Sequence, residues 1–234
     1  MFPITVSVQL IVKHLTTKHM TNNPSTEDEI VHTFYLWLCA ENTAKAAEVL
    51  KNPDEMAYFH QIAEQAKAAF HKKFYNDEEK TYGDYGPNIL ALWMGVPEER
   101  KADVVASLRK EIMETHGGHI NTGFVSTKFF FETLSDNGLH DVAMTVMKKT
   151  DYPSYGNWIR QGATVTWEQW NGQNSHNHPM FGGGLTWFSR YLAGVNVTKE
   201  RVIVILRCGL CQPRDWTASI IACSHRKASS VRGF

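Results

Sequence analysis

The chain has 234 residues, of which 43% are hydrophobic and 21% are charged, so it can bury a sizeable core and is not a disordered polypeptide. Its 24 lysine and arginine residues balance 24 aspartate and glutamate residues, which leaves no basic field to hold a nucleic acid or an anionic membrane surface. No apolar run reaches the roughly 18 residues that a membrane-spanning helix needs, and four cysteines are too few for a disulfide scaffold. Composition therefore favours a globular protein with a neutral ligand.

The first 12 residues are largely apolar but lack the order of a secretory signal. Lys13 and Lys18 follow the apolar segment instead of preceding it, and Ser7 and Gln9 interrupt it. We therefore expect no signal peptide and, by default, a cytoplasmic location. Residues 1–23 are expected to form a leader that is disordered or unrelated to the domain after it.

From residue 24 onward, caps and apolar periodicity predict a series of helices. Thr26 and Glu29 form a capping box before a helix that runs to about Leu50, and Asn52 with Pro53 repeats the start signal for a helix ending near residue 74. Further helices are expected over residues 87–94, 97–112, 127–136, 140–149 and 184–192. This order indicates an all-α array of antiparallel hairpins. The apolar stripes are wide for so few helices, which predicts self-association through exposed helix faces.

Beyond residue 195 the pattern changes, because Arg201–Leu206 is a β-branched strand pattern. Residues 196–234 are expected to be the remnant of a C-terminal β-domain, too short for a core of its own. The tail holds four potential zinc ligands, Cys208, Cys211, Cys223 and His225. Their spacing fits no common zinc finger and nearby arginines would repel a cation, so no metal site is predicted. Cys39, within the first helix, is expected to be a core thiol.

An aromatic segment, residues 152–188, is the part most informative about function. It contains four of the seven tryptophans, namely Trp158, Trp167, Trp170 and Trp187. Glu168 is the only acidic residue between residues 152 and 195, and it lies between Trp167 and Trp170. A carboxylate in aromatic surroundings can act as a general base or acid. The alternative is that Glu168 forms an ion pair with Arg160 or Arg190 while the tryptophans only fill a core.

Three polar residues, His176, Asn177 and His178, follow this carboxylate. They suit a polyhydroxylated ligand, because the apolar face of a sugar packs on an aromatic ring while imidazole and amide groups bind its hydroxyls. His176 and His178 could instead bind a metal, but a spacing of two without a third ligand is a weak pattern. We predict neither a metal nor a cofactor.

An ordered series of motifs runs through the second half of the chain. It comprises residues 118–124 (GHINTGF), 134–138 (LSDNG), 152–156 (YPSYG), 162–170 (GATVTWEQW) and 175–178 (SHNH). This series resembles the C-terminal half of the catalytic domain of bacterial α-L-rhamnosidases. The similarity covers roughly residues 26–195, and its diagnostic part is the WE-x-W block followed by S-x-N-H.

The resemblance implies an incomplete (α/α)6 barrel over residues 24–195 and a glycosidase that hydrolyses terminal α-L-rhamnosyl residues with inversion. It assigns Glu168 as the general base and His178 as a rhamnose ligand. The sugar site is expected to include five further residues, Trp158, Trp167, Trp170, His119 and Asn177. The implied partner is a rhamnose-containing glycoside or polysaccharide, and no cofactor is required.

Three departures from the family pattern shape the expected activity. The family's general-acid glutamate lies in the N-terminal half of the barrel, and nothing before Glu27 resembles its motif. A family tryptophan is absent from residues 13–23, and the C-terminal β-sandwich is reduced to a first strand. We therefore expect a fragment without its general acid, with Glu132, Asp136 and Asp84 the next candidates for that role. The alternatives are a non-catalytic sugar-binding remnant and a helical interaction module.

Overall fold

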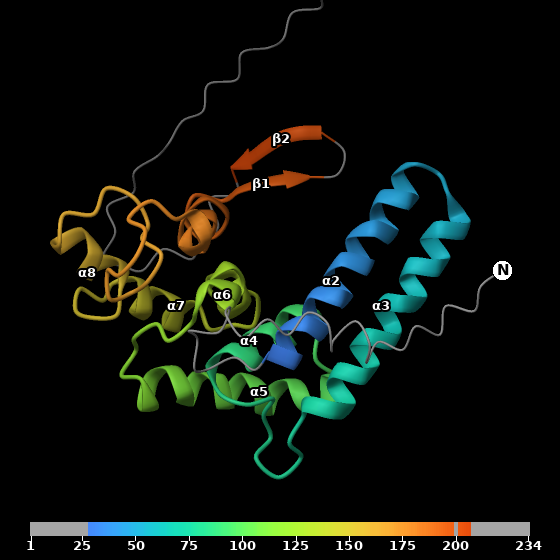
Figure 1. Cartoon of the computed structure of the whole chain (residues 1–234), viewed down its shortest axis with the longest axis horizontal. Coiled ribbons are helices and arrows are strands. Elements are labelled where there is room, and N and C mark those ends of the chain that lie inside the picture. Colours follow the sequence, from blue (N-terminus) through green and yellow to red (C-terminus); the bar gives the residue numbers. More distant parts are fainter. Residues whose placement is uncertain (1–27, 199–200, 207–234) are drawn as a thin grey trace, which may run out of the picture. The chain divides into compact units, whose positions relative to one another are not determined.

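The computed structural model describes residues 28–198 and 201–206 (Figure 1). The chain divides into two compact units between Leu185 and Thr186. The predicted leader and the cysteine-containing tail lie outside the described residues. In the part that is described, no helix is long and apolar enough to cross a membrane.

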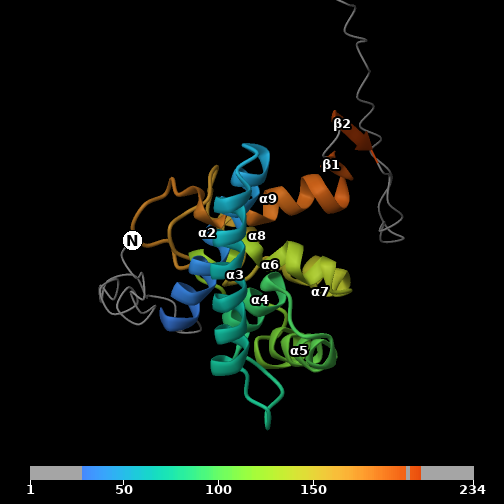
Figure 2. The same ribbon diagram turned by 90° about the vertical axis from the view of Figure 1, so that its right-hand side faces the viewer.

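The first hairpin pairs α2 (Asp28–Val49) with α3 (Pro53–Phe74), and the two helices run side by side (Figures 1 and 2). The turn forms where the sequence predicts it, because the Asn52 side chain accepts a hydrogen bond from the Glu55 amide at 3.3 Å and Pro53 begins the next helix. Buried alanines on both helices, Ala44 and Ala63 among them, allow close approach. The predicted hairpin is therefore confirmed.

Helix α2 carries apolar side chains around its whole circumference. Ile30 and Phe34 are fully buried, whereas Leu36 and Trp37 are only half-buried, and Val49 at the hairpin tip is 80% exposed. A helix that is apolar on all sides is typical of the interior of a larger assembly. Self-association through this surface stays a prediction. The expectation for Cys39 is wrong, since this thiol is exposed.

The next four helices form the core of the first unit. They are α4 (Tyr85–Met94), α5 (Glu98–Lys110) with a π-helical extension η1 (Glu111–Thr115), α6 (Phe124–Asp136) and α7 (His140–Met147). Helix α4 is almost entirely buried, and it lies between α5 and α6 (Figures 1 and 2). Aromatic rings join the layers, with Tyr85 stacked on Phe130 at 5.4 Å and Phe34 meeting Phe129 edge-on at 5.1 Å. The fold is thus the predicted array of helical hairpins.

The C-terminal part contains one helix that the sequence pattern did not predict, α8 (Tyr155–Arg160). It then continues through η2 (Pro179–Phe181), α9 (Gly183–Trp187) and η3 (Phe188–Leu192). In the second unit, β1 (Val195–Thr198) pairs antiparallel with β2 (Arg201–Leu206), which confirms the strand expected there. The assignment of this hairpin to a reduced β-domain stays a prediction.

A buried histidine ties α3 to the loops on either side of α4. His71 is 8% exposed, its Nε2 lies 3.0 Å from the Gly95 carbonyl and its Nδ1 lies 2.6 Å from the Tyr82 hydroxyl. Since the carbonyl only accepts, Nε2 carries the proton and Nδ1 accepts from Tyr82. Burial lowers the pKa of His71 to about 4, with the cations of Lys67 and Arg100 adding to the effect and the bond to Gly95 opposing it.

This histidine should make the fold sensitive to acid. The unfolded chain takes up a proton near the ordinary pKa of 6.5, whereas the folded chain resists until about pH 4. Stability is therefore full above pH 6.5 and declines as pH falls towards 4, by at most about 3 kcal/mol from this group. Urea unfolding at several pH values measures the slope. His71→Gln should flatten it, and an unaltered slope in His71→Gln would contradict the assignment.

Candidate active site

The predicted base lies on an irregular loop, residues 161–178, that follows α8. Backbone hydrogen bonds fold it into a hairpin: the Glu168 amide donates to the Ser175 carbonyl and the His178 amide donates to the Thr166 carbonyl, both at 2.8 Å. The Thr166 hydroxyl adds a bond to the His178 carbonyl at 2.5 Å. The loop therefore carries Glu168 and His178 on one locally fixed piece of backbone.

The tip of this loop needs residues that tolerate positive φ. Gly172 has φ +77°, and a Cβ there would lie 2.9 Å from the Trp167 ring, closer than real Cβ contacts. Asn174 has φ 64°, a conformation in which asparagine is enriched among non-glycine residues. The sequence Asn-Gly-Gln-Asn after Trp170 is thus suited to a tight turn that packs on Trp167.

The Glu168 carboxylate is half-buried and is held by its own loop. Oε2 accepts from the Ser175 amide at 3.0 Å, and the Asn174 side-chain nitrogen lies 3.5 Å from Oε1. Arg160, one of the two cations considered as an ion-pair partner, instead donates to the Thr150 carbonyl at 3.4 Å. Arg160 therefore bonds elsewhere than at Glu168, and the choice between a catalytic and a structural carboxylate stays a prediction.

The tryptophans of the segment pack against one another. Trp158 and Trp167 are 2% and 6% exposed and, together with Phe181, form a small core against which Trp170 is half-buried. Trp158 stacks on Trp170 with ring centroids 4.4 Å apart, and its indole N–H donates to the Trp170 carbonyl at 3.0 Å. In this geometry Trp158 and Trp167 support the loop, and Trp170 has the more accessible ring of the three.

The three polar residues after Glu168 occupy different environments. His178 Nδ1 is buried and has no hydrogen-bond partner among the described residues. Leaving such a nitrogen unsatisfied costs about 1–3 kcal/mol, so it is suited to a ligand hydroxyl. Asn177 is exposed, while the ring of His176 stacks on Trp167. No cluster of three potential metal ligands occurs in the described part of the chain.

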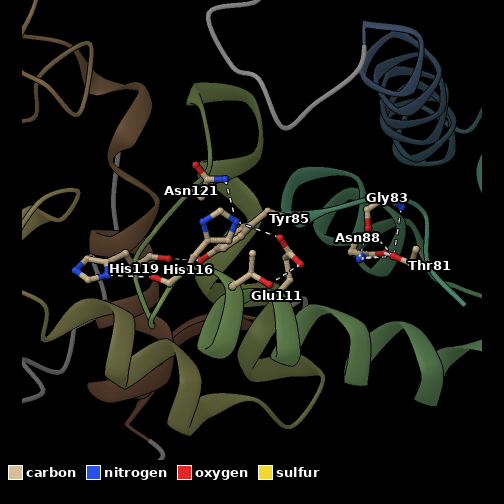
Figure 3. Close-up of polar contacts among 9 residues, drawn as sticks. Thr81, Gly83, Tyr85, Asn88, Glu111, His116, His119 and Asn121 are labelled. Carbon is tan, nitrogen blue, oxygen red and sulfur yellow. Dashed lines mark hydrogen bonds and ion pairs between the residues drawn. The ribbon is translucent and has the colours of Figure 1, made fainter. Parts of the chain in front are cut away.

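His119 lies in a separate polar network on the loop between η1 and α6 (Figure 3). Its Nδ1 donates to the His116 carbonyl at 3.1 Å, its Nε2 is 2.9 Å from Asp151 Oδ1, and its carbonyl accepts from the Tyr85 hydroxyl at 2.8 Å. The bond from His119 holds the pKa of the Asp151 carboxyl below its usual value. Both ring nitrogens therefore face acceptors already, and a sugar hydroxyl at His119 would have to compete with them.

The same network fixes the loop beneath the tryptophans. His116 Nε2 lies 3.1 Å from Glu111 Oε1, and Asn121 points to the same nitrogen at 3.3 Å (Figure 3). One residue further on, the buried Thr122 offers its carbonyl to the Trp170 indole N–H at 2.9 Å. Sequence reasoning missed this support, because its partners come from α4, η1 and the loop, far apart in the chain.

The three alternative candidates for the general acid lie outside the Glu168 loop. Glu132 on α6 is 5% exposed, Asp136 at the end of α6 is exposed, and Asp84 precedes α4 and is exposed. Each takes part in further interactions of its own.

An array of helical hairpins is the architecture of six-hairpin glycosidase domains, and the solved structures that this chain is similar to have this fold. Within that class, the model for the bacterial alpha-L-rhamnosidase 6 hairpin glycosidase domain matches residues 11–192, so the chain belongs to this family.

Individual relatives agree with this membership. An α-L-rhamnosidase of Formosa agariphila is 29% identical over 191 residues, which is 74% of this chain and 20% of the relative. Among solved structures, the α-L-rhamnosidase from Dictyoglumus thermophilum is 36% identical with a TM-score of 0.69, over 73% of this chain and 20% of that one. The Streptomyces avermitilis α-L-rhamnosidase complexed with L-rhamnose is 25% identical with a TM-score of 0.65, over 72% and 17%. The chain thus spans about a fifth of the length of the relatives that it matches.

Removing the Trp170 indole N–H should loosen the contact between the two loops. Trp170→Phe keeps a ring over Trp158 but takes away the bond to the buried Thr122 carbonyl, so we expect a loss of about 1–2 kcal/mol in the free energy of unfolding, measured with urea. Trp93→Phe is the matched control, since no described residue bonds the indole N–H of Trp93. Equal losses in both variants would show that only ring packing matters.

Proposed function

We propose that this chain supplies the base-bearing part of an α-L-rhamnosidase active site, with Glu168 as the general base for inverting hydrolysis of a terminal α-L-rhamnosyl group. The observation that carries the proposal is a half-buried carboxylate fixed by the Ser175 amide on the same loop as a buried, unpartnered His178 Nδ1. Family membership supports it, because the match includes this loop.

In the proposed mechanism Glu168 accepts a proton from a water molecule while the oxygen of that water forms a bond to the anomeric carbon. The glycosidic oxygen leaves from the opposite face and needs a proton from a second carboxyl group. In inverting enzymes the two carboxyl groups stand about 6.5–9.5 Å apart, so that water fits between base and sugar. Glu168 is the sole carboxylate of the loop, and we propose that the acid comes from a part of the barrel outside the matched segment.

The surrounding residues would then divide into ligands and supports. His178 would bind a sugar hydroxyl through Nδ1, with the exposed amide of Asn177 and the ring of Trp170 as further contacts. The buried rings of Trp158 and Trp167 would hold these ligands in place, and His119 would contribute through the neighbouring loop.

A non-catalytic sugar-binding role is the second candidate. It is favoured by the single carboxylate of the loop, since binding through His178 and Trp170 does not require an acid. Both roles concern a rhamnose-containing ligand, and they differ in whether a glycosidic bond is broken.

Leaving-group dependence separates these two roles. A dinitrophenyl α-L-rhamnoside releases a phenolate that needs no proton, so the purified chain should hydrolyse it. An alkyl rhamnoside needs a proton on its leaving oxygen, so the chain should hydrolyse it about 10²–10⁴-fold more slowly than the dinitrophenyl substrate. Initial rates with both substrates measure the ratio. Hydrolysis of the alkyl rhamnoside at a comparable rate would show that the chain contains its own acid, and Glu132, Asp136 and Asp84 would then be tested. No hydrolysis of either, with rhamnose still bound, would favour the sugar-binding role.

Substitution of Glu168 separates base from scaffold. The matched residues 11–192 are grafted into a complete α-L-rhamnosidase. In this hybrid, Glu168→Gln should preserve folding and KM but lower kcat about 10²–10⁴-fold, because an amide cannot accept the proton from water. His178→Ala should instead raise KM more than it lowers kcat. Glu64→Gln, on exposed α3, is the control. An unchanged kcat with a lowered Tm in Glu168→Gln would make the glutamate structural.

A further inference from the structure

We infer that His176 is a positioning residue for Glu168: it latches the tip of the loop onto Trp167 and thereby fixes the direction of the carboxylate. This inference rests on the proposed function, in which Glu168 is the base. From the sequence alone His176 suits a sugar or metal ligand, and its exposed position agrees with that view. Its contacts point to a different role.

The first contact is a face-to-face stack. The imidazole of His176 lies on the indole of Trp167 with ring centroids 4.1 Å apart and an interplanar angle of 9°. Trp167 itself is 6% exposed and packs on Trp158, so His176 stacks on a buried side chain. One face of the His176 ring is therefore covered by a buried side chain.

The second contact is a hydrogen bond that links His176 to Gly172, which itself packs on Trp167. His176 Nε2 donates to the Gly172 carbonyl at 2.8 Å, and Gly172 in turn lies against the edge of the Trp167 ring, so close that a Cβ would be 2.9 Å from it. Trp167, Gly172 and His176 thus hold one another at the tip of the loop. The Nε2 nitrogen of His176 is thus taken up by a bond within the loop.

Glu168 is connected to these three residues both along the chain and through a hydrogen bond. It follows Trp167 directly in the chain, and its Oε2 accepts from the amide of Ser175, which directly precedes His176. The Glu168 amide also donates to the Ser175 carbonyl at 2.8 Å. If the stack of His176 is lost, the Ser175 amide is free to turn, and the carboxylate loses the donor that orients it.

Amide exchange of the full chain tests the latch without requiring turnover. In His176→Ala the Ser175 amide should exchange about tenfold faster than in the unaltered chain, while amides of α4 keep their rates. His176→Phe, which restores a ring over Trp167 but not the bond to Gly172, should recover part of the protection. Gly172→Ala, which forces a Cβ against Trp167, should reproduce the loss, and His60→Ala on exposed α3 is the matched control. Unchanged Ser175 exchange in His176→Ala would overturn the inference.

Turnover of dinitrophenyl α-L-rhamnoside then distinguishes this inference from the proposed function. If both hold, Glu168→Gln lowers kcat about 10²–10⁴-fold, and His176→Ala lowers kcat about tenfold with KM nearly unchanged and with partial rescue in His176→Phe. A collapse in Glu168→Gln with full kcat in His176→Ala would overturn the positioning role alone. Full turnover in Glu168→Gln would overturn the assignment of the base, and with it the purpose given to the latch, whatever the exchange rates show.

Discussion

The packing of the Trp167 indole is the constraint on which the candidate site depends. Its ring is buried against Trp158, receives the stack of His176 and meets the backbone of Gly172 at its edge. Glu168 is the next residue in the chain, and its carboxylate accepts from the Ser175 amide of the same loop. An irregular loop gains in this way a geometry that hydrogen bonds between exposed segments alone would not hold.

Support for this loop comes from several elements of the helical array. Trp170 donates to the Thr122 carbonyl. The segment that contains Thr122 is held by Tyr85 of α4, which donates to the His119 carbonyl, and by the contact of His116 with Glu111 of η1. The candidate loop is thus joined to the helical array through polar contacts to backbone carbonyls. This division between a packed scaffold and a variable loop is common in enzymes, since a loop can present side chains that a regular helix would bury.

The α2 surface shows the other consequence of the chain's composition. Apolar side chains such as Leu36 and Trp37 are only half-buried within the described part of the chain. The chain matches about a fifth of its relatives, and a domain of six hairpins offers further helices that could cover such a face.

Local sequence signals determined most of the helical architecture. The cap at Asn52 with Pro53, and the apolar periods that follow, placed α3 and its neighbours because capping and periodicity act within a few residues. Helix α8 escaped prediction, since its six residues are too few for a period and depend on the Ser154 cap, whose side chain accepts from the Asn157 amide at 2.9 Å. The exposure of Cys39 was also not predictable, because α2 has no polar face to indicate which side meets α3.

For the site, the sequence by itself determined the family, the carboxylate Glu168 and the cluster of aromatic and imidazole side chains around it. The tertiary structure decided which of these groups are available. It buried Trp158 and Trp167, engaged both ring nitrogens of His119 and the Nε2 of His176, and left His178 Nδ1 unpartnered. The physical reason is that a side chain's availability depends on acceptors and rings brought to it from distant segments, such as Asp151 for His119. Spacing along the chain does not encode that proximity.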